Sequence, residues 1–300
     1  MFLSCIIYYM ISIIIPFKYD SENRLENILE LCKYIKKYWL FDEVFVVEMD
    51  ESPKIINLLP EWCKYIFVKE KNNETWSRSK RINIAMPMVK SKLTMILDSD
   101  VIVDWSYVEY IAEKIKNNEL DAATPFDNLY HVSRNIIIQE MKKNKIEPVS
   151  FLNNNKKEIS RIFKTNGACF ITKTDIFKHI RGMNELFIGW GLEDDELIER
   201  YSKLNYRYGR ISGPAIHINH ERTNNCHPDP NNFLGSITEK NRIKILDKEQ
   251  ILEYYGIKEK IGLYSSINKP ESSDNDILTK LVNEEIKLYS SNNSVAPYII

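Results

Sequence analysis

The sequence predicts an α/β fold in which helices flank a mostly parallel central sheet, followed by a C-terminal appendage. Three observations favour this fold. Short β-branched runs alternate with amphipathic helical segments from residue 11 to residue 118, two aspartates follow one of the buried runs, and the tail from about residue 265 is polar. Strands that alternate with helices of this length pair in parallel, and such sheets bind ligands at the carboxyl ends of their strands.

The first half of the chain begins with a strand and a helix. "ISIIIPF", residues 11–17, is rich in β-branched side chains and predicts a buried strand. Asp20 and Ser21 supply capping side chains directly before the helix predicted over residues 21–39. Apolar residues recur in that helix at helical spacing, namely Leu25, Ile28, Leu29, Cys32 and Ile35.

The alternation continues through the next segments. Residues 44–50 and 65–70 predict short strands, and a polar loop over 71–80 leads into a helix over 81–90. "LTMILDSD", residues 93–100, predicts another buried strand.

The following segments combine helices with extended chain. Residues 105–118 predict a helix, and "GACFITKTDIF" predicts a strand that turns into a short helix. "YRYGRISGPAIHINH" predicts extended chain interrupted by glycine. In "EDDELIERYSKLNY" one helical face carries Leu197, Ile198, Tyr201 and Leu204.

Composition and charge exclude some classes of partner. Of the 300 residues 44% are hydrophobic, and the formal net charge is -1, so no global basic field exists to hold a nucleic acid. The cysteines are odd in number, far apart and without a CxxC pair, which favours reduced thiols in a cytosolic-type compartment over disulfides or a zinc site. They are Cys5, Cys32, Cys63, Cys169 and Cys226.

The apolar start of the chain raises the alternative of a membrane segment. The run ends at Pro16 after about 15 residues, whereas a spanning helix needs ~20. It also lacks the basic start and the small-residue cleavage site of a signal peptide. We therefore expect no transmembrane anchor, and peripheral membrane association stays open.

Two aspartates follow the buried strand in "MILDSDVIV". Asp98 and Asp100 lie where the strand gives way to a loop, so their carboxylates can converge on a hard cation such as Mg²⁺ or Mn²⁺, or on ribose hydroxyls. The alternative is a strand that ends in ordinary turn-forming residues.

A basic cluster approaches a helix start in "TWSRSKRIN". Arg78, Lys80 and Arg81 next to a helix amino end would suit a diphosphate. The alternative is a solvated basic loop.

Three of the five histidines fall within eleven residues of "AIHINHERTNNCHPDP". They are His217, His220 and His227, and imidazoles can join a carboxylate in a metal site. In a straight strand His217 and His220 would face opposite sides, so both reach one metal only if the chain turns between them.

Four consecutive acids follow a Gly-Trp-Gly turn in "FIGWGLEDDELIERY". The helix dipole stabilises each acid of a first turn by ~0.3–1 kcal/mol, but two carboxylates about 4 Å apart repel by ~1 kcal/mol in water and by ~4 at an effective dielectric of 20. A helix cap therefore explains one or two acids, and the full cluster indicates a polar ligand. Trp190 offers a flat apolar surface on which a sugar ring can stack.

Taken in order, these motifs resemble the GT-A fold glycosyltransferases, in particular the branch of the beta-1,4-galactosyltransferases and the bacterial capsule and chondroitin-type enzymes. "IIIPFK" is similar to the first nucleotide-binding strand, "WSRSKRIN" to the arginine-bearing donor loop and "LDSD" to the DxD motif. "GWGLEDDE" resembles the GWGxEDD motif, and "HINHERTNN…HPDPNNF" resembles the closing metal-histidine segment. The resemblance covers about residues 11 to 240.

The resemblance implies a role for each matching residue. Asp194 would be the general base and Glu193 a partner of the acceptor hydroxyl. The implied donor-binding residues are Pro16, Lys18, Arg78, Asp98 and Asp100. The implied acceptor-binding residues are Trp190, Gly191 and Asp195. The implied metal ligands for Mn²⁺ or Mg²⁺ are Asp100, His220 and His217.

Three residues depart from the family pattern. Lys18 stands where the galactosyltransferases often have arginine, Leu192 replaces a glycine, and His217 replaces a methionine of the animal enzymes. The animal stem and anchor have no counterpart, which favours a cytoplasmic, microbial-type enzyme. These departures bear on the acceptor pocket and on metal preference.

The implied activity is a metal-dependent inverting transfer of galactose or N-acetylgalactosamine from a UDP-sugar to a saccharide acceptor, as in capsule polysaccharide biosynthesis. Displacing a nucleoside diphosphate builds charge that a cation and Arg78 would offset, and a carboxylate would take the hydroxyl proton. The alternatives are a retaining N-acetylgalactosaminyltransferase-like enzyme, a metal-dependent phosphohydrolase or nucleotidyltransferase, and a non-catalytic sugar-binding protein of the same fold.

The resemblance also divides the chain. Residues 1–245 would form the GT-A domain, with a donor-binding half over about 11–125 and an acceptor and catalytic half over about 160–240. Residues 246–300 would form a helical, polar extension. We expect Asp100, Asp194 and His220 to meet in one cleft.

Overall fold

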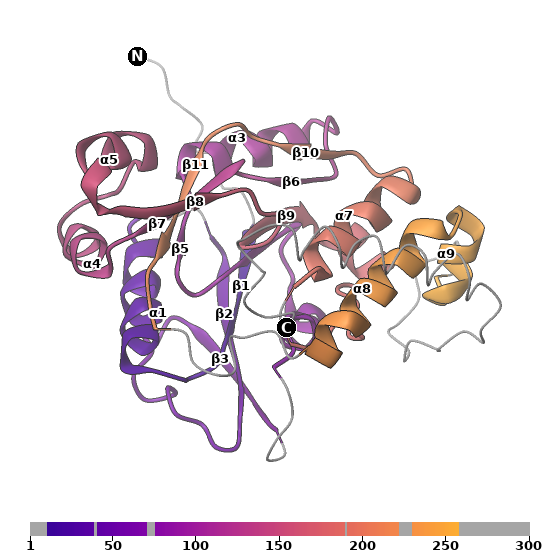
Figure 1. The fold of residues 1–300 in the computed structure, drawn as a ribbon, viewed down its shortest axis with the longest axis horizontal. Helices are drawn as coiled ribbons and strands as arrows, with labels where there is room; N and C mark the ends of the chain where they lie inside the picture. The colour runs from indigo at the N-terminus through magenta and orange to yellow at the C-terminus, as the bar shows by residue number, and fades with distance from the viewer. Residues whose placement is uncertain (1–10, 39–40, 71–75, 190, 222–229, 258–300) are drawn as a thin grey trace.

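The computed structural model describes residues 11–38, 41–70, 76–189, 191–221 and 230–257. Within these ranges the chain forms a large sheet with helices on both faces and a smaller sheet against it (Figure 1). The predicted α/β class is therefore confirmed. None of the helices in these ranges combines the length and the apolar character that a bilayer span requires.

Seven strands make the large sheet, in the order β10-β6-β9-β4-β1-β2-β3. The pairs β1–β2, β1–β4, β2–β3 and β6–β10 are parallel, while β9 runs antiparallel between β4 and β6. The strands are β1 (Ile11–Phe17), β2 (Glu43–Asp50), β3 (Lys64–Lys69), β4 (Leu93–Leu97), β6 (Ala122–Thr124), β9 (Cys169–Lys173) and β10 (Tyr208–Arg210).

Helices cover both faces because the central strands are apolar on both sides. All seven residues of β1 are buried, and they divide between two clusters. Ile13 and Ile15 pack on the side of α1 (Glu22–Ile35) and α3 (Trp105–Lys116). Ile14 faces α2 (Arg78–Ala85), α6 (Thr174–His179), α7 (Glu193–Lys203) and α9 (Lys248–Tyr254).

A second sheet, absent from the sequence-based expectations, has the order β5-β11-β7-β8. Its strands are β5 (Val101–Ile102), β7 (Asn128–Val132), β8 (Ile159–Phe163) and β11 (Pro214–Ile218). Two further helices, α4 (Arg134–Lys143) and α5 (Pro148–Asn154), connect β7 to β8. Because β5 follows directly on Asp100 and pairs with β11, this sheet carries His217 of β11 to the end of β4.

One predicted boundary was wrong. The helix expected from residue 81 begins at Arg78, and a short 3-10 turn follows it over Met86–Met88. The hydroxyl of Ser77 caps the earlier start, because its oxygen accepts a hydrogen bond from the backbone N–H of Lys80 at 3.3 Å.

The C-terminal part of the described chain packs onto the large sheet. α8 (Pro230–Ile245) ends at the boundary expected for the domain, and α9 continues the packing with Ile251, Tyr254 and Tyr255 in the second apolar cluster. The polar tail predicted beyond residue 257 lies outside the described residues. The described cysteines Cys32, Cys63 and Cys169 are buried free thiols.

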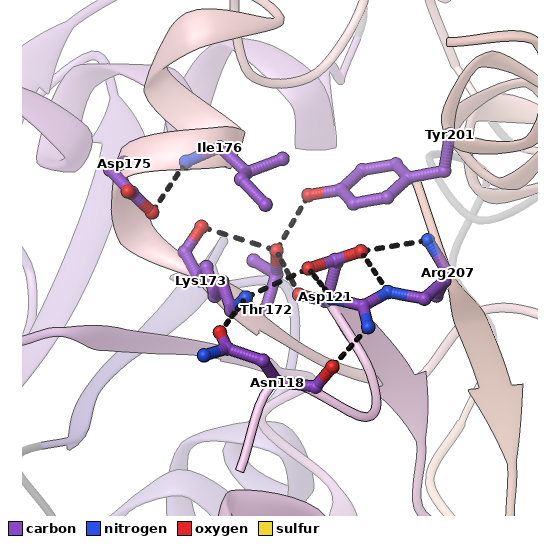
Figure 2. Close-up of polar contacts among 8 residues, drawn as sticks. All are labelled: Asn118, Asp121, Thr172, Lys173, Asp175, Ile176, Tyr201 and Arg207. Carbon is purple, nitrogen blue, oxygen red and sulfur yellow. Dashed lines mark hydrogen bonds and ion pairs between the residues drawn. The ribbon is translucent and has the colours of Figure 1, made fainter. Parts of the chain in front are cut away.

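Asp121 joins three strands through the polar contacts that Figure 2 shows. It directly precedes β6, and Thr172 of β9 pairs with both Ala122 and Thr94, so Asp121 lies at the end of the sheet opposite the aspartates that follow β4. Its carboxylate accepts hydrogen bonds from Lys173 at 2.8 Å and from the Arg207 backbone and guanidinium at 2.9 Å each. Burial alone would raise its pKa, but these donors hold the pKa below its usual range. The charge therefore fixes β6, β9 and β10 against one another.

Candidate active site

A cleft of about 890 Å³ opens at the carboxyl ends of β1 and β4, beneath the start of α7. Ligands bind at this edge in open α/β sheets. Every site residue that the family resemblance implies, within the described part of the chain, lines it: Pro16, Lys18, Arg78, Asp98, Asp100, Gly191, Glu193, Asp194, Asp195, His217 and His220. Trp190 and His227 lie outside the described residues.

Arg78 joins the two halves of the cleft. From the first residue of α2 its Nε donates to Asp98 at 2.8 Å and its Nη1 to Asp194 at 2.9 Å, with Glu193 at 3.9 Å. The side chain is only 8% exposed. Burial disfavours its charge, but the three carboxylates outweigh burial and raise the pKa of Arg78 above its ordinary value.

The other two cations of the predicted basic cluster do not line the cleft. Arg81 is fully buried, donates to the Met49 carbonyl at 2.9 Å and pairs with Glu70 at 3.2 Å. Its guanidinium carbon lies 3.7 Å from the ring centre of Trp76. Arg81 thus holds Trp76, which does line the cleft.

Asp100, His217 and His220 form a cluster that could hold a metal ion. Their ligand atoms lie within 4.8 Å of one another. Asp100 is 3.0 Å from His220 Nε2 and 3.7 Å from His217 Nε2. Burial would raise the pKa of Asp100, but the two imidazoles and Arg24 hold it well below its usual range. One ionised carboxylate with two imidazoles offers oxygen and nitrogen ligands that suit a divalent metal ion, so the donor set fits a divalent metal.

The two histidines converge because the chain leaves the sheet between them. β11 ends at Ile218, so His217 points from the strand while His220 approaches from the following loop. The sheet behind His217 orders its ring: His131 of β7 stacks on it at 4.2 Å with an interplanar angle of 15°. The condition that the chain must turn between the two histidines is met.

The first two acids of α7 face the cleft and Arg78. Glu193 is 10% and Asp194 is 18% exposed, and no side chain caps the helix. Burial and the charge of Asp194 raise the pKa of Glu193 well above its ordinary value, and Arg78 opposes the rise. Burial also raises the pKa of Asp194, and Arg78 opposes the rise.

The other two acids of this turn do not contact Arg78, although Asp195 also lines the cleft. Asp195 accepts from Asn166 at 2.5 Å and lies 3.5 Å from Lys240. Glu196 is fully buried, pairs with Arg200 at 2.9 Å and accepts from Tyr255 at 2.7 Å. Successive helical residues point about 100° apart, so Asp195 and Glu196 have partners other than the Arg78 that Glu193 and Asp194 share.

Unusual backbone surrounds the start of α7. Gly191 has φ +101° and Leu192 has φ +73°, a left-handed conformation that costs a non-glycine residue roughly 1–2 kcal/mol. A close approach fixes Asp194 as well, because a Cβ at Gly167 would lie 2.4 Å from Asp194 Oδ2. Strain of this kind is common at functional sites.

Several cleft residues were not predicted. Asp20, expected to cap α1, instead pairs with Arg24 at 3.0 Å, and both line the cleft, while Ser21 caps the helix. The second sheet and the segments next to it add a further group: Leu129, His131, Arg161, Phe163, Lys164 and Arg210. No motif marks them, because their places depend on strand pairings that sequence periodicity did not reveal.

The fold and the cleft define a glycosyltransferase of the GT-A class. The chain belongs to glycosyl transferase family 2, whose family model matches residues 12–181. A second model, described as the N-terminal domain of galactosyltransferase, matches residues 150–223. No curated protein sequence matches the chain.

Solved structures are similar to the chain at low sequence identity, and the one with a TM-score above 0.5 shares its fold. Residues 1–349 of Staphylococcus aureus TarS, in complex with UDP-GlcNAc, match with 15% identity and a TM-score of 0.54 over 94% of this chain and 74% of that one. Glucosyl-3-phosphoglycerate synthase from Mycobacterium tuberculosis, in complex with Mn²⁺, UDP and phosphoglyceric acid, matches with 13% identity and a TM-score of 0.44 over 71% and 72%.

Proposed function

We propose that this enzyme transfers galactose or N-acetylgalactosamine from a UDP-sugar to a saccharide acceptor, with inversion at the anomeric carbon and dependence on a divalent metal. The observation that carries the proposal is the bridge made by Arg78 between Asp98, beside the candidate metal cluster, and Asp194, at the start of α7. This bridge supports a donor-side cation and a proton acceptor within one cleft.

The donor end is rich in groups that suit a nucleoside diphosphate. Arg24, Arg78 and Lys18 line it together with the Asp100, His217 and His220 cluster. A divalent ion bound there supplies positive charge to the leaving diphosphate. The TarS complex with UDP-GlcNAc supports a UDP-sugar donor, and the match to the galactosyltransferase model supports galactose or a relative of it.

Asp194 is the proposed general base. An acceptor hydroxyl is a poor nucleophile until a carboxylate takes its proton, and burial brings the pKa of Asp194 above its usual range, towards working pH. Glu193, whose pKa burial and Asp194 raise, would contact the acceptor hydroxyl. Asp195 and Gly191 line the same side and would bound the acceptor site.

The proposal is tested by product analysis. The metal-stripped enzyme is incubated with UDP-galactose, UDP-N-acetylgalactosamine, UDP-glucose or UDP-N-acetylglucosamine, with Mn²⁺, Mg²⁺ or EDTA, and a panel of saccharide acceptors. Proton NMR should show a β-linked product from the α-linked donor only when metal is present. An α-linked product would overturn inversion, and UDP-sugar hydrolysis without transfer in the presence of every acceptor would overturn the transferase proposal.

A further inference from the structure

Cations gather on one wall of the cleft, away from the candidate metal cluster. Residues 156–164 contain Lys156, Lys157, Arg161 and Lys164 but one acid, Glu158, in a chain whose net charge is -1. Arg161 and Lys164 are exposed and line the cleft. The local excess of positive charge therefore faces the ligand space.

Strand register fixes where this wall lies. His217 of β11 pairs with His131 of β7, and His131 pairs with Arg161 of β8. Directly paired residues share a face of a sheet, and neighbouring strands are ~4.8 Å apart. Arg161 therefore lies about 10 Å across the sheet from the metal-side histidine. β8 is the outer strand, so the cleft continues to the sheet edge.

An aromatic ring accompanies the cations. Phe163 lies two residues after Arg161 on the same face of β8, and the Arg161 guanidinium is 5.2 Å from the ring centre. Phe163 also contacts His131, with ring centres 4.9 Å apart. A flat apolar ring beside a cation suits a sugar that carries a negative charge.

The charge on this wall is not neutralised by the protein. Among the residues that the structure describes, no carboxylate oxygen lies within 4.0 Å of a side-chain nitrogen of Arg161, Lys164 or Arg210, unlike Arg78 with its two aspartates. Arg210 instead donates to the carbonyl of Thr165 at 2.9 Å and thereby orders the segment after Lys164.

Asp127 also lines the cleft near this wall, but its carboxylate already accepts hydrogen bonds from the protein. Its oxygens accept from the Gly213 backbone N–H at 3.1 Å and from the Ser212 hydroxyl at 3.0 Å. These donors outweigh burial and lower the pKa of Asp127. Asp127 remains ionised, and its bonds turn it towards the loop that carries Ser212 and Gly213.

We propose that the acceptor is an acidic saccharide, whose carboxylate or phosphate group binds Arg161 and Lys164 while a sugar ring packs on Phe163. This inference rests on the proposed transferase function, because it assigns the far end of the same cleft to the acceptor.

The test compares matched acceptors. A glucuronate-terminated disaccharide and its glucose-terminated counterpart of the same linkage are titrated into the full chain loaded with Mn²⁺ and UDP, and binding is followed by calorimetry. A glycerol-phosphate oligomer provides the phosphate arm. Arg161→Gln/Lys164→Gln is compared with Lys156→Gln, which removes an exposed charge from the same segment outside the cleft lining.

The wild type should bind one of the acidic ligands about tenfold more tightly than the neutral one, as expected for two partly screened ion pairs, and added salt should reduce the preference. The double variant should lose the preference, and Lys156→Gln should keep it. Whichever acidic ligand binds more tightly, the glucuronate-terminated disaccharide or the glycerol-phosphate oligomer, identifies the anion as a carboxylate or a phosphate. Equal binding of acidic and neutral ligands by the wild type, or an unchanged preference in the double variant, would overturn the inference.

The same variants show whether the bound anion belongs to the acceptor or to the donor sugar. If UDP-glucuronate, and not the acidic disaccharide, loses affinity in the double variant, the anion belongs to the donor sugar and the inference is wrong. Because the experiment measures binding, it tests the acidic acceptor site even if no transfer is observed. Failure of transfer with intact acidic-saccharide binding would count against the proposed function and leave the acidic site standing.

Discussion

The guanidinium of Arg78 donates a hydrogen bond to the carboxylate of Asp194 at 2.9 Å, although 116 positions separate the two residues. Asp98 accepts from the same guanidinium at 2.8 Å. A single buried cation thus organises carboxylates from the end of β4 and from the start of α7. Arg78 therefore stabilises the fold and also orients the carboxylates of the proposed active site.

Replacing Arg78 should therefore reduce stability as well as activity. Arg78→Gln leaves Asp98, Glu193 and Asp194 without their shared cation, and loss of one partner of a buried ion pair costs about 3–5 kcal/mol. Urea unfolding at pH 7 should show this loss. Arg78→Lys keeps the charge without the planar fork and should recover part of the stability but little UDP-sugar binding. A wild-type midpoint for Arg78→Gln would contradict the role of the bridge.

Gly167 should control the position of Asp194. In Gly167→Ala the new methyl group would lie 2.4 Å from Asp194 Oδ2, so the carboxylate must move. A displacement of about 1 Å at a catalytic group can lower turnover by roughly 100-fold. We expect steady-state kinetics to show a reduced kcat while UDP affinity changes little.

A helical glycine serves as the control for that substitution. A Cβ at Gly235 meets nothing within 4 Å, so Gly235→Ala should keep activity and stabilise α8 by about 0.5–1 kcal/mol. Equal kcat values for the two alanine variants would refute the positioning role of Gly167.

Metal binding should depend on the Asp100 cluster. Loss of a residue that only hydrogen-bonds a metal ligand lowers metal affinity roughly 10- to 100-fold. Asp100→Asn and His217→Gln each remove a proposed ligand itself, so each should lower Mn²⁺ affinity by more than this. Electron paramagnetic resonance of free Mn²⁺ measures this without turnover. His179→Gln, a change in α6 away from the cleft lining, should bind as the wild type does. Wild-type affinity in Asp100→Asn would exclude the cluster as the metal site.

Stability should fall in acid partly through Asp121. The folded-state pKa of this group lies below its unfolded value, so its contribution is complete above the unfolded pKa of about 3.9 and is lost as pH falls through the folded pKa. Asp121→Asn should cost about 1–3 kcal/mol at pH 7 and progressively less below pH 4. Unfolding curves from pH 7 to pH 2.5 measure the difference, and a pH-independent difference would contradict the assignment.

Residues in short motifs could be predicted, and those placed by long-range pairing could not. Asp98, Asp100, Glu193 and Asp194 stand in segments whose chemistry shows in the sequence, and the first-half strands and helices follow from periodicity. Arg161 lines the cleft only because β8 pairs with β7, and "NLYHV" and "ISRIF" carry no strong two-residue alternation.

Some predicted residues took unexpected partners. Arg81 shares the motif of Arg78 and lies one helical turn further on, where it is buried against Glu70 and the Met49 carbonyl. Asp20 looks like a helix cap from its position but forms an ion pair with Arg24 at the cleft. Neither outcome is visible without the packing of β3 and α1 around these side chains.

The most direct test of the account is single-turnover transfer by Asp194→Asn. The asparagine oxygen can still accept from Arg78, so the cleft should keep its shape and bind UDP-sugar with Mn²⁺ much as the wild type does. We predict that transfer falls by at least about 100-fold, the usual contribution of a general base. Transfer at the wild-type rate with intact donor binding would contradict the assignment of Asp194 as the base.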